Sequence, residues 1–452
     1  MDRRRILGWW FYDWASQPYA TLLLTFIFAP YFSTIAAQSL IAHGTPAAEA
    51  AAGAQSMWGV GLGLSGVVIA ILAPILGAIA DQTGRRLPWV WGFSVLYVVG
   101  AAGLWWLAPG TGPLGLWLVI ALFGLGVIGM EFTTIFTNAL LPGLGPRSEI
   151  GRISGTGAAL GYVGGVLALA VMLLGFAENQ AGLTLLGHPP AFGLDGAARE
   201  GTRFAGPFTA LWYIVFMLPF ALAVREPRGP ARPLRLGAAL RDLWLLLASL
   251  RSRPSLLAWL TSSMLARDAL NGLYAFGGIY AATVLDWPVT RIGVFGVISA
   301  VAAAIITWAG GHADRRWGPK PVLVAAMLVL TLVCMGLVGM DRNAIFGMAL
   351  TPGSALPDNI FLGAGVLIGA AGGVLQSAAR TMMVRHTSPE RATEAFGLYA
   401  LSGKATAFVA PLSIAFVTSA TGSVRAGISP LIVMFIAALI LLVWVRAEGE
   451  SP

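Results

Sequence analysis

A short polar segment, Gly77-Ala-Ile-Ala-Asp81-Gln-Thr-Gly84-Arg85-Arg86, separates two long apolar stretches of the chain. Glycine permits a tight turn, and an acidic side chain near a turn can accept N–H bonds at the start of a neighbouring helix, where the helix dipole favours negative charge. Arginines can pair with carboxylates and hold such a turn in place. We therefore predict that Gly77, Asp81, Gly84, Arg85 and Arg86 form a conformational latch.

A related segment, Gly310-Gly-His-Ala-Asp314-Arg315-Arg316-Trp-Gly318-Pro-Lys320, follows at the corresponding place in the second half. Two copies at matching positions indicate a duplicated six-helix unit, an arrangement common in transporters. This copy has one extra residue between Asp314 and Gly318, so a latch role for Asp314, Arg315 and Gly318 is less secure. Simple basic turns would explain the arginines but not the repeated Gly–Asp–Gly spacing.

The composition indicates that lipid is the main solvent of this chain. Of the 452 residues 57% are hydrophobic and 11% are charged, whereas soluble domains usually have about 25% charged residues. A membrane helix needs about 20 mainly apolar residues. Twelve stretches meet this need: 9–36, 57–80, 88–108, 114–141, 153–176, 205–224, 255–284, 291–311, 321–340, 359–379, 394–418 and 428–445. The predicted fold is an all-α polytopic membrane protein with twelve transmembrane helices in two pseudo-symmetric six-helix bundles.

The basic residues predict the orientation of these spans. With both termini in the cytoplasm, 21 of the 28 basic residues lie on the inner side, as the positive-inside rule requires. The high net charge then serves topology and lipid headgroups, not nucleic acid. We expect an N-terminal bundle (1–224), a cytoplasmic linker (225–253) and a C-terminal bundle (254–452). Leucines at helical spacing in the linker indicate an amphipathic helix on the inner leaflet, although an ordinary solvated linker is an equal alternative for its first half.

The paired turns resemble the cytoplasmic-loop signature of the major facilitator superfamily. That resemblance implies that Asp81 engages a helix of the opposite half and steadies one access state. A narrower resemblance, to the vacuole-effluxer-like family, rests on motifs in both halves. They are Trp10-Phe-Tyr-Asp13-Trp-Ala-Ser-Gln-Pro-Tyr19, Asn138-Ala-Leu-Leu-Pro142, Gly151-Arg-Ile-Ser154-Gly155 and Phe396-Gly-Leu-Tyr399-Ala-Leu-Ser-Gly403-Lys404. This family implies movement of small solutes, and its fungal members are associated with release of amino acids.

Ionisable residues inside the spans mark the candidate transport path, because charges in lipid are costly and usually face a cavity. They fall on spans 1, 4, 7 and 11, with one more at the inner end of span 10, and in this superfamily spans 1, 4, 7 and 10 line the path. The candidate residues, together with the nearby amide of Asn138, are Asp13, Glu131, Asn138, Arg267, Asp268, Arg380 and Lys404.

The depth of these residues suggests different roles. Lys404 and Arg267 lie about 15 Å and about 18 Å into their spans, and Glu131 is also near mid-depth. Asp13 lies close to the start of its span, so an interfacial structural role is as good an interpretation as transport. We hypothesise that Glu131 or Asp268 exchanges a proton, with Lys404 or Arg267 as counter-charge or as a contact for a substrate carboxylate. A permanent structural ion pair between helices is an equally good interpretation.

The sequence thus favours a secondary active transporter, not an enzyme, that moves a small polar solute by alternating access. Amino acids and the efflux direction follow from the resemblance, and charges of both signs suit a zwitterion. We expect a coupling ion such as the proton, contact with membrane lipids, no nucleic acid, no cofactor and no metal site. We expect a monomer in the bacterial inner membrane, with a vacuolar membrane as the alternative location. A membrane enzyme acting on a lipid-linked substrate and a transport-dead receptor or regulator are the alternatives.

Overall fold

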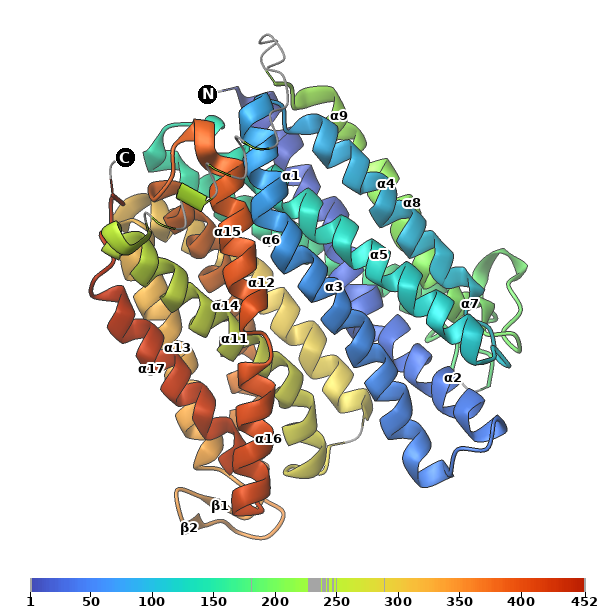
Figure 1. Ribbon diagram of the computed structural model, residues 1–452. Coiled ribbons are helices and arrows are strands. Elements are labelled where there is room, and N and C mark those ends of the chain that lie inside the picture. Colours follow the sequence, from blue (N-terminus) through green and yellow to red (C-terminus); the bar gives the residue numbers. More distant parts are fainter. Residues whose placement is uncertain are drawn as a thin grey trace.

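Long helices lie side by side through most of the computed structural model (Figure 1). The structure describes residues 2–179, 181–226, 237, 241, 244–245, 248, 250–287 and 289–450. In this part of the chain the only strands are β1 (Ala344–Ile345) and β2 (Met348–Ala349), which pair antiparallel. The predicted amphipathic helix of the linker falls largely outside the described residues.

Helices from the first half of the chain gather on one side of the molecule and form the N-terminal bundle (Figure 1). The elements are α1 (Arg3–Pro18), the π-helix η1 (Tyr19–Phe26), α2 (Phe28–Ala42), α3 (Ala47–Thr83), α4 (Leu87–Gly103), η2 (Leu104–Trp106), α5 (Pro113–Asn138), η3 (Leu141–Gly143), η4 (Arg147–Glu149), α6 (Ile150–Gly175), η5 (Ala191–Gly193), α7 (Glu200–Arg203), α8 (Ala205–Phe216) and α9 (Leu218–Ala223).

The remaining helices form the C-terminal bundle on the other side. The elements are η6 (Leu250–Ser252), α11 (Pro254–Thr283), α12 (Val289–Trp317), α13 (Pro319–Val338), α14 (Leu356–Arg385), η7 (Pro389–Arg391), α15 (Ala392–Ala405), α16 (Val409–Thr421), η8 (Ala426–Ile428) and α17 (Ser429–Leu442). The first turn of α1 and residues 443–450 lie at the same end of the molecule, which we call the termini end (Figure 1). At the opposite end, the far end, α3 and α16 diverge.

The helices of the described chain account for twelve membrane crossings. Ten segments are long and apolar enough to cross a membrane, and a 17-residue apolar segment, Ala426–Leu442, is somewhat shorter. The twelfth is α11, which has 30 residues but carries Arg267 and Asp268 near its middle. Large apolar side chains such as Leu332 (65% exposed) and Phe416 (73% exposed) point outward, as expected where lipid surrounds a protein. The predicted all-α fold is confirmed.

Several span boundaries differ from the prediction, and the differences move charged residues deeper. The first span begins at Arg3 instead of residue 9, so Asp13 lies ten residues inside it. The eighth span continues to Trp317 and the tenth to Arg385, instead of ending at 311 and 379. These polar helix ends pack against protein, so hydropathy alone does not mark them. Asp13 therefore lies farther from the start of its helix than the predicted boundary implied.

Small residues let the two bundles touch at the termini end. A methyl group on Gly155 of α6 would lie 2.4 Å from the Cα atom of Gly311 on α12. A methyl group on Gly397 of α15 would lie 2.4 Å from the carbonyl oxygen of Ala73 on α3. Side chains larger than hydrogen would separate the helices at both places. These two crossings are the close contacts between bundles that small residues allow in membrane proteins.

The end of the chain packs around His386, directly after α14. His386 Nε2 lies 2.9 Å from the Ser255 hydroxyl, and Nδ1 lies 3.0 Å from the Met382 carbonyl oxygen. The Ser255 hydroxyl accepts the Arg446 N–H, and Glu450 accepts the Ser255 N–H. A neutral imidazole has one donor and one acceptor, which suits these two partners. Burial lowers the pKa of His386 below its ordinary value.

Acidification should therefore destabilise the protein through His386. Below pH about 6.5 the unfolded chain binds a proton at this residue that the folded chain resists, so stability falls as the pH falls. We expect the melting temperature in detergent to drop about 1–3 °C more between pH 7.5 and 5.5 in the wild type than in His386→Gln. His312→Gln, at an exposed position, is the control and should keep the wild-type slope. Equal slopes for His386→Gln and the wild type would contradict this account.

Candidate functional site

A cavity of about 450 Å³ lies between the two bundles. Helices α1, α5 and α6 line it from the N-terminal bundle, and α11, α14 and α15 line it from the C-terminal bundle. Its polar lining consists of Asp13, Ser16, Gln17, Glu131, Thr134, Asn138, Tyr162, Arg267, Asn271, Gln376, Arg380, Tyr399 and Lys404. The structure thus brings together six of the seven residues predicted for the path.

An ion pair between Lys404 and Glu131 crosses the cavity. Lys404 Nζ on α15 lies 2.6 Å from Glu131 Oε1 on α5, and the side chains are 26% and 23% exposed. The partners come from different bundles and lie 273 residues apart in the chain. An ion pair removed from water is favourable only when its geometry is good, and breaking one side leaves a costly charge. Separation of α5 from α15 would break this pair.

A second ion pair joins the same two bundles closer to the termini end. Arg380 Nη1 on α14 lies 3.0 Å from Asp13 Oδ2 on α1, and it donates to Asn138 Oδ1 at 3.4 Å. Arg380 Nη2 donates to the Ser154 carbonyl oxygen at 3.0 Å. Asp13 precedes the π-helix η1, which begins directly after Pro18. π-helical turns are frequent at functional sites.

Arg267 faces the cavity in a different way from the other two cations. Its Nη1 donates to the Tyr399 carbonyl oxygen at 3.1 Å, and its guanidinium carbon lies 4.3 Å from the centre of the Tyr399 ring. A methyl group on Gly403 would lie 2.4 Å from Arg267 Nη2, so this glycine makes room for the guanidinium. Among the residues that the structure describes, no carboxylate lies within 4.0 Å of its nitrogens.

Asp268 does not line the cavity, which corrects its placement on the predicted path. It is 2% exposed, and its Oδ2 accepts the N–H of Ala410 at 3.1 Å. The eleventh span is broken at residues 406–408, and Ala410 belongs to the first turn of α16. Asp268 therefore satisfies the start of a helix whose existence as a separate element was not predicted.

The first predicted latch places Asp81 at a helix start of the opposite bundle. Asp81 Oδ2 accepts the Glu394 N–H at 2.7 Å, and Oδ1 accepts the Thr393 N–H at 3.2 Å. Arg86 Nη2 lies 3.0 Å from Asp81 Oδ1, and Arg86 Nε donates to the Thr393 hydroxyl at 2.8 Å. Gly84 has φ +67°, a left-handed backbone conformation that glycine adopts easily because it has no Cβ atom. Arg85 is exposed.

The second predicted latch lies on the last turns of α12 instead of in a loop. Asp314 is 2% exposed and packs against Gly151 in the first turn of α6, where a methyl group would lie 2.4 Å from Asp314 Cγ. Arg315 Nε lies 2.7 Å from Glu149 Oε1. Gly318 has φ +82° and ends the turn. Both motif aspartates thus lie at the start of a helix of the other bundle.

Apart from Asn138, the neutral polar residues of the cavity were not predicted. Gln17, Tyr162, Asn271, Gln376 and Tyr399 stand within apolar stretches, and that position is the signal that would have found them. Glu226 was also missed: its carboxylate accepts the N–H groups of Arg86 and Leu87 at 2.8–2.9 Å, at the start of α4.

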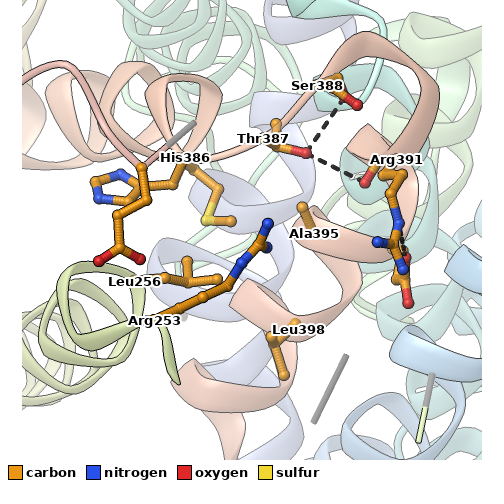
Figure 2. Close-up of a pocket in the computed structure, with 11 residues that line it drawn as sticks. Arg253, Leu256, His386, Thr387, Ser388, Arg391, Ala395 and Leu398 are labelled. Carbon is orange, nitrogen blue, oxygen red and sulfur yellow. Dashed lines mark hydrogen bonds and ion pairs between the residues drawn. The ribbon is translucent and has the colours of Figure 1, made fainter. Parts of the chain in front are cut away.

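A second, smaller cavity lies at the termini end of the C-terminal bundle. Figure 2 shows it, with the Thr387 hydroxyl donating toward the carbonyl oxygens of Ser388 and Arg391, 3.3 Å away in each case. Its volume is about 40 Å³, enough for a water molecule or two. It is too small for a solute. The central cavity, with its charged lining between the bundles, is the candidate site. Among the described residues no cluster of three or more His, Cys, Asp or Glu side chains is arranged to hold a metal ion.

Comparison with known proteins identifies relatives of this chain. The family model described as "Vacuole effluxer Atg22 like" matches residues 1–450. The uncharacterized MFS-type transporter YxiO of Bacillus subtilis (strain 168) is 23% identical over 98% of this chain and 95% of its own length. Autophagy-related protein 22 of Cryptococcus neoformans var. neoformans (strain B-3501A) is 22% identical over 66% of this chain and 53% of its own. The chain spans about half the length of that fungal relative.

Solved structures show the same fold. The human organic anion transporter MFSD10 (TETRAN) has a TM-score of 0.70 at 17% identity, with 98% of this chain and 99% of that chain covered. The major facilitator superfamily transporter FucP in the outward conformation has a TM-score of 0.67 at 14% identity, with 99% and 100% covered. The chain therefore belongs to the vacuole effluxer Atg22-like family and is a multi-pass membrane transporter with the major facilitator fold.

Proposed function

We propose that this protein is a secondary active transporter that moves a small polar solute by alternating access. The observation that carries the proposal is the charged cavity between the bundles, crossed by two ion pairs whose partners come from opposite bundles. Rocking of two six-helix units about a midplane site is how such folds transport solutes. Inter-bundle ion pairs rearrange during that motion, which links it to the content of the cavity.

The orientation follows from the distribution of basic residues. With both termini cytoplasmic, the termini end is the inner face, and the described conformation is closed inward and open outward. Support comes from the inter-bundle contacts of Asp81 and Asp314 at the termini end and from the divergence of α3 and α16 at the far end (Figure 1). We place the protein in the bacterial inner membrane as a monomer, a location consistent with its bacterial relative.

The substrate class that we propose is amino acids or similar small solutes, moved in the efflux direction. The family description supports a solute effluxer, and the cavity volume of about 450 Å³ suits a solute of that size. A proton is the proposed coupling ion, with Glu131 as its carrier and Lys404 as the counter-charge. Protonation of Glu131 would remove half of the ion pair that now joins α5 and α15.

We also propose that the turn around Asp81 is a latch for the inward-closed state. Its carboxylate satisfies two N–H groups at the start of α15, where no side chain of the C-terminal bundle caps the helix. Such a cap contributes about 1 kcal/mol, enough to bias an equilibrium but not to lock it. Opening of the termini end would break this contact.

The function is tested with purified protein in proteoliposomes that hold an imposed pH gradient. Radiolabelled amino acids, sugars, peptides and organic acids are offered in turn, and uptake into protein-free vesicles is subtracted. Saturable transport of one class, abolished when the gradient is collapsed by a protonophore, is the expected outcome. Absence of transport for every class in both directions would refute the proposal.

Replacement of Glu131 should uncouple transport from the proton. Glu131→Gln keeps the shape of the side chain but cannot exchange a proton, so gradient-driven uptake should fall at least about ten-fold, the equivalent of ~1.4 kcal/mol. Exchange of solute across the membrane without a gradient should persist and lose its dependence on pH. Glu49→Gln, at an exposed position in the first turn of α3, is the matched control. Unchanged proton dependence in Glu131→Gln would exclude the coupling role.

Replacement of Asp81 should shift the protein toward the state that is open at the termini end. In a Cys334→Ser background, spin labels at the exposed positions Gln55 of α3 and Phe416 of α16 report the far-end separation. Asp81→Asn removes the negative charge from the start of α15 and from the ion pair with Arg86. It should raise the shorter-distance population roughly five-fold, corresponding to about 1 kcal/mol. Arg85→Gln, in the same turn but exposed, should leave the distances unchanged. A distance distribution in Asp81→Asn equal to that of the parent would disprove the latch.

A further inference from the structure

The cavity contains one more positive than negative group, and the surplus can be assigned to one residue. Of its five charged residues, Asp13 pairs with Arg380 and Glu131 pairs with Lys404. Arg267 remains, and no carboxylate of the described chain lies within ion-pair distance of it. A guanidinium that is partly withdrawn from water without an anion is costly. The charge balance of the cavity therefore favours one anionic group from outside the chain.

The geometry of Arg267 leaves its guanidinium ready for such a group. A guanidinium carries five N–H donors in a planar fork, and the structure gives one hydrogen bond, from Nη1 to the Tyr399 carbonyl oxygen. The face of the guanidinium rests on the Tyr399 ring at 4.3 Å, and its edge lies against Gly403. The ring and the glycine fix the plane of the fork while donors stay available toward the cavity. A planar, fixed fork matches the two oxygens of a carboxylate.

The neighbours of Arg267 also indicate which bundle holds this group. Tyr399 and Gly403 are on α15 and Arg267 is on α11, so all three belong to the C-terminal bundle. The two ion pairs, in contrast, join the bundles and must change when the bundles move. A group bound at Arg267 can stay in place while the access side changes.

We propose that Arg267 binds the carboxylate of the transported solute, and that a solute ammonium group contributes little to binding. The second part follows because both carboxylates of the cavity are already paired, at 2.6 and 3.0 Å. The inference rests on the proposed transport function and narrows it. A carboxylic acid without an amino group should bind at least as well as the corresponding amino acid, and the amide of that amino acid should not bind.

The test measures binding to the full chain in detergent by thermal shift and by calorimetry. Each probe set consists of one amino acid, its deaminated carboxylic acid and its amide; sets are built on alanine, leucine, phenylalanine and glutamine. In the wild type we expect the acid and the amino acid of at least one set to bind and its amide to fail. In Arg267→Gln carboxylate binding should weaken roughly 10- to 100-fold, with a smaller loss in Arg267→Lys, which keeps the charge but not the fork.

Two further variants separate recognition from folding. Gly403→Ala leaves Arg267 in the chain but places a methyl group 2.4 Å from its Nη2, so it should also weaken carboxylate binding. Arg203 is the matched control, because it likewise donates to a backbone carbonyl oxygen, that of Trp105 at 3.0 Å, and lies 4.5 Å from the ring of that tryptophan. It does not line the cavity, so Arg203→Gln should bind the probes like the wild type.

The outcomes distinguish this inference from the proposed function. If Arg267→Gln weakens carboxylates and amides equally, or if amides bind the wild type as well as acids, recognition by Arg267 is overturned while transport stands. Failure of every carboxylate to bind the wild type also overturns it, and the proteoliposome assay with the other solute classes then decides the function separately.

Discussion

The cost of an ionised side chain in hydrocarbon organises this molecule. Asp13, Glu131, Arg267, Arg380 and Lys404 stand on five different helices, yet all of them reach one cavity. Lipid offers no partner for these groups, so each has to find an opposite charge, a polar neighbour or water inside the protein. The helices that carry them must therefore surround a common polar space, and the helices without them can face lipid. The need to shelter these charges from lipid is therefore enough to explain why the polar cavity exists, in addition to its proposed role as a solute site.

The same requirement makes the two bundles separable. Their contacts at the termini end are helix caps, single ion pairs and glycine crossings, such as the Asp81 cap on α15 and the approach of Gly155 to Gly311. A single cap contributes about 1 kcal/mol, and α6 with α12 and α3 with α15 also pack closely along the seam between the bundles. In the proposed transport cycle, opening of the termini end has to break these caps, ion pairs and crossings together.

The duplicated motif shows how symmetry and function diverge. Asp81 and Asp314 both lie at the start of a helix of the opposite bundle, as expected for equivalent positions in a repeat. Asp81 accepts two backbone N–H groups and pairs with Arg86, whereas Asp314 is packed tightly against Gly151. Asp81 lies in the last turn of α3 and Asp314 in the last turn of α12, so both copies present the carboxylate from a helix end.

The parts of the site that the sequence did not predict depend on contacts between residues far apart in the chain. Glu131 and Lys404 were both expected near mid-depth, but their pairing joins residues 273 positions apart, and nothing local encodes it. Arg380 was placed at the edge of its span because hydropathy falls there, although α14 continues to Arg385 against protein. Asp268 was expected on the path, and only the break before α16 explains why it faces a helix start.

By itself the sequence determined the twelve spans, the repeat and the charged residues that have to be sheltered. Lipid makes this possible, because each crossing requires about 20 apolar residues and an unsatisfied polar group in lipid is costly. Apolar stretches and the charged residues within them can therefore be recognised directly in the sequence. The tertiary structure alone decided which charges pair, which bundle each pair joins, and that Arg267 is left without an anion. Those outcomes depend on how helices distant in sequence are rotated and packed against one another, and that geometry has no signature within any one span.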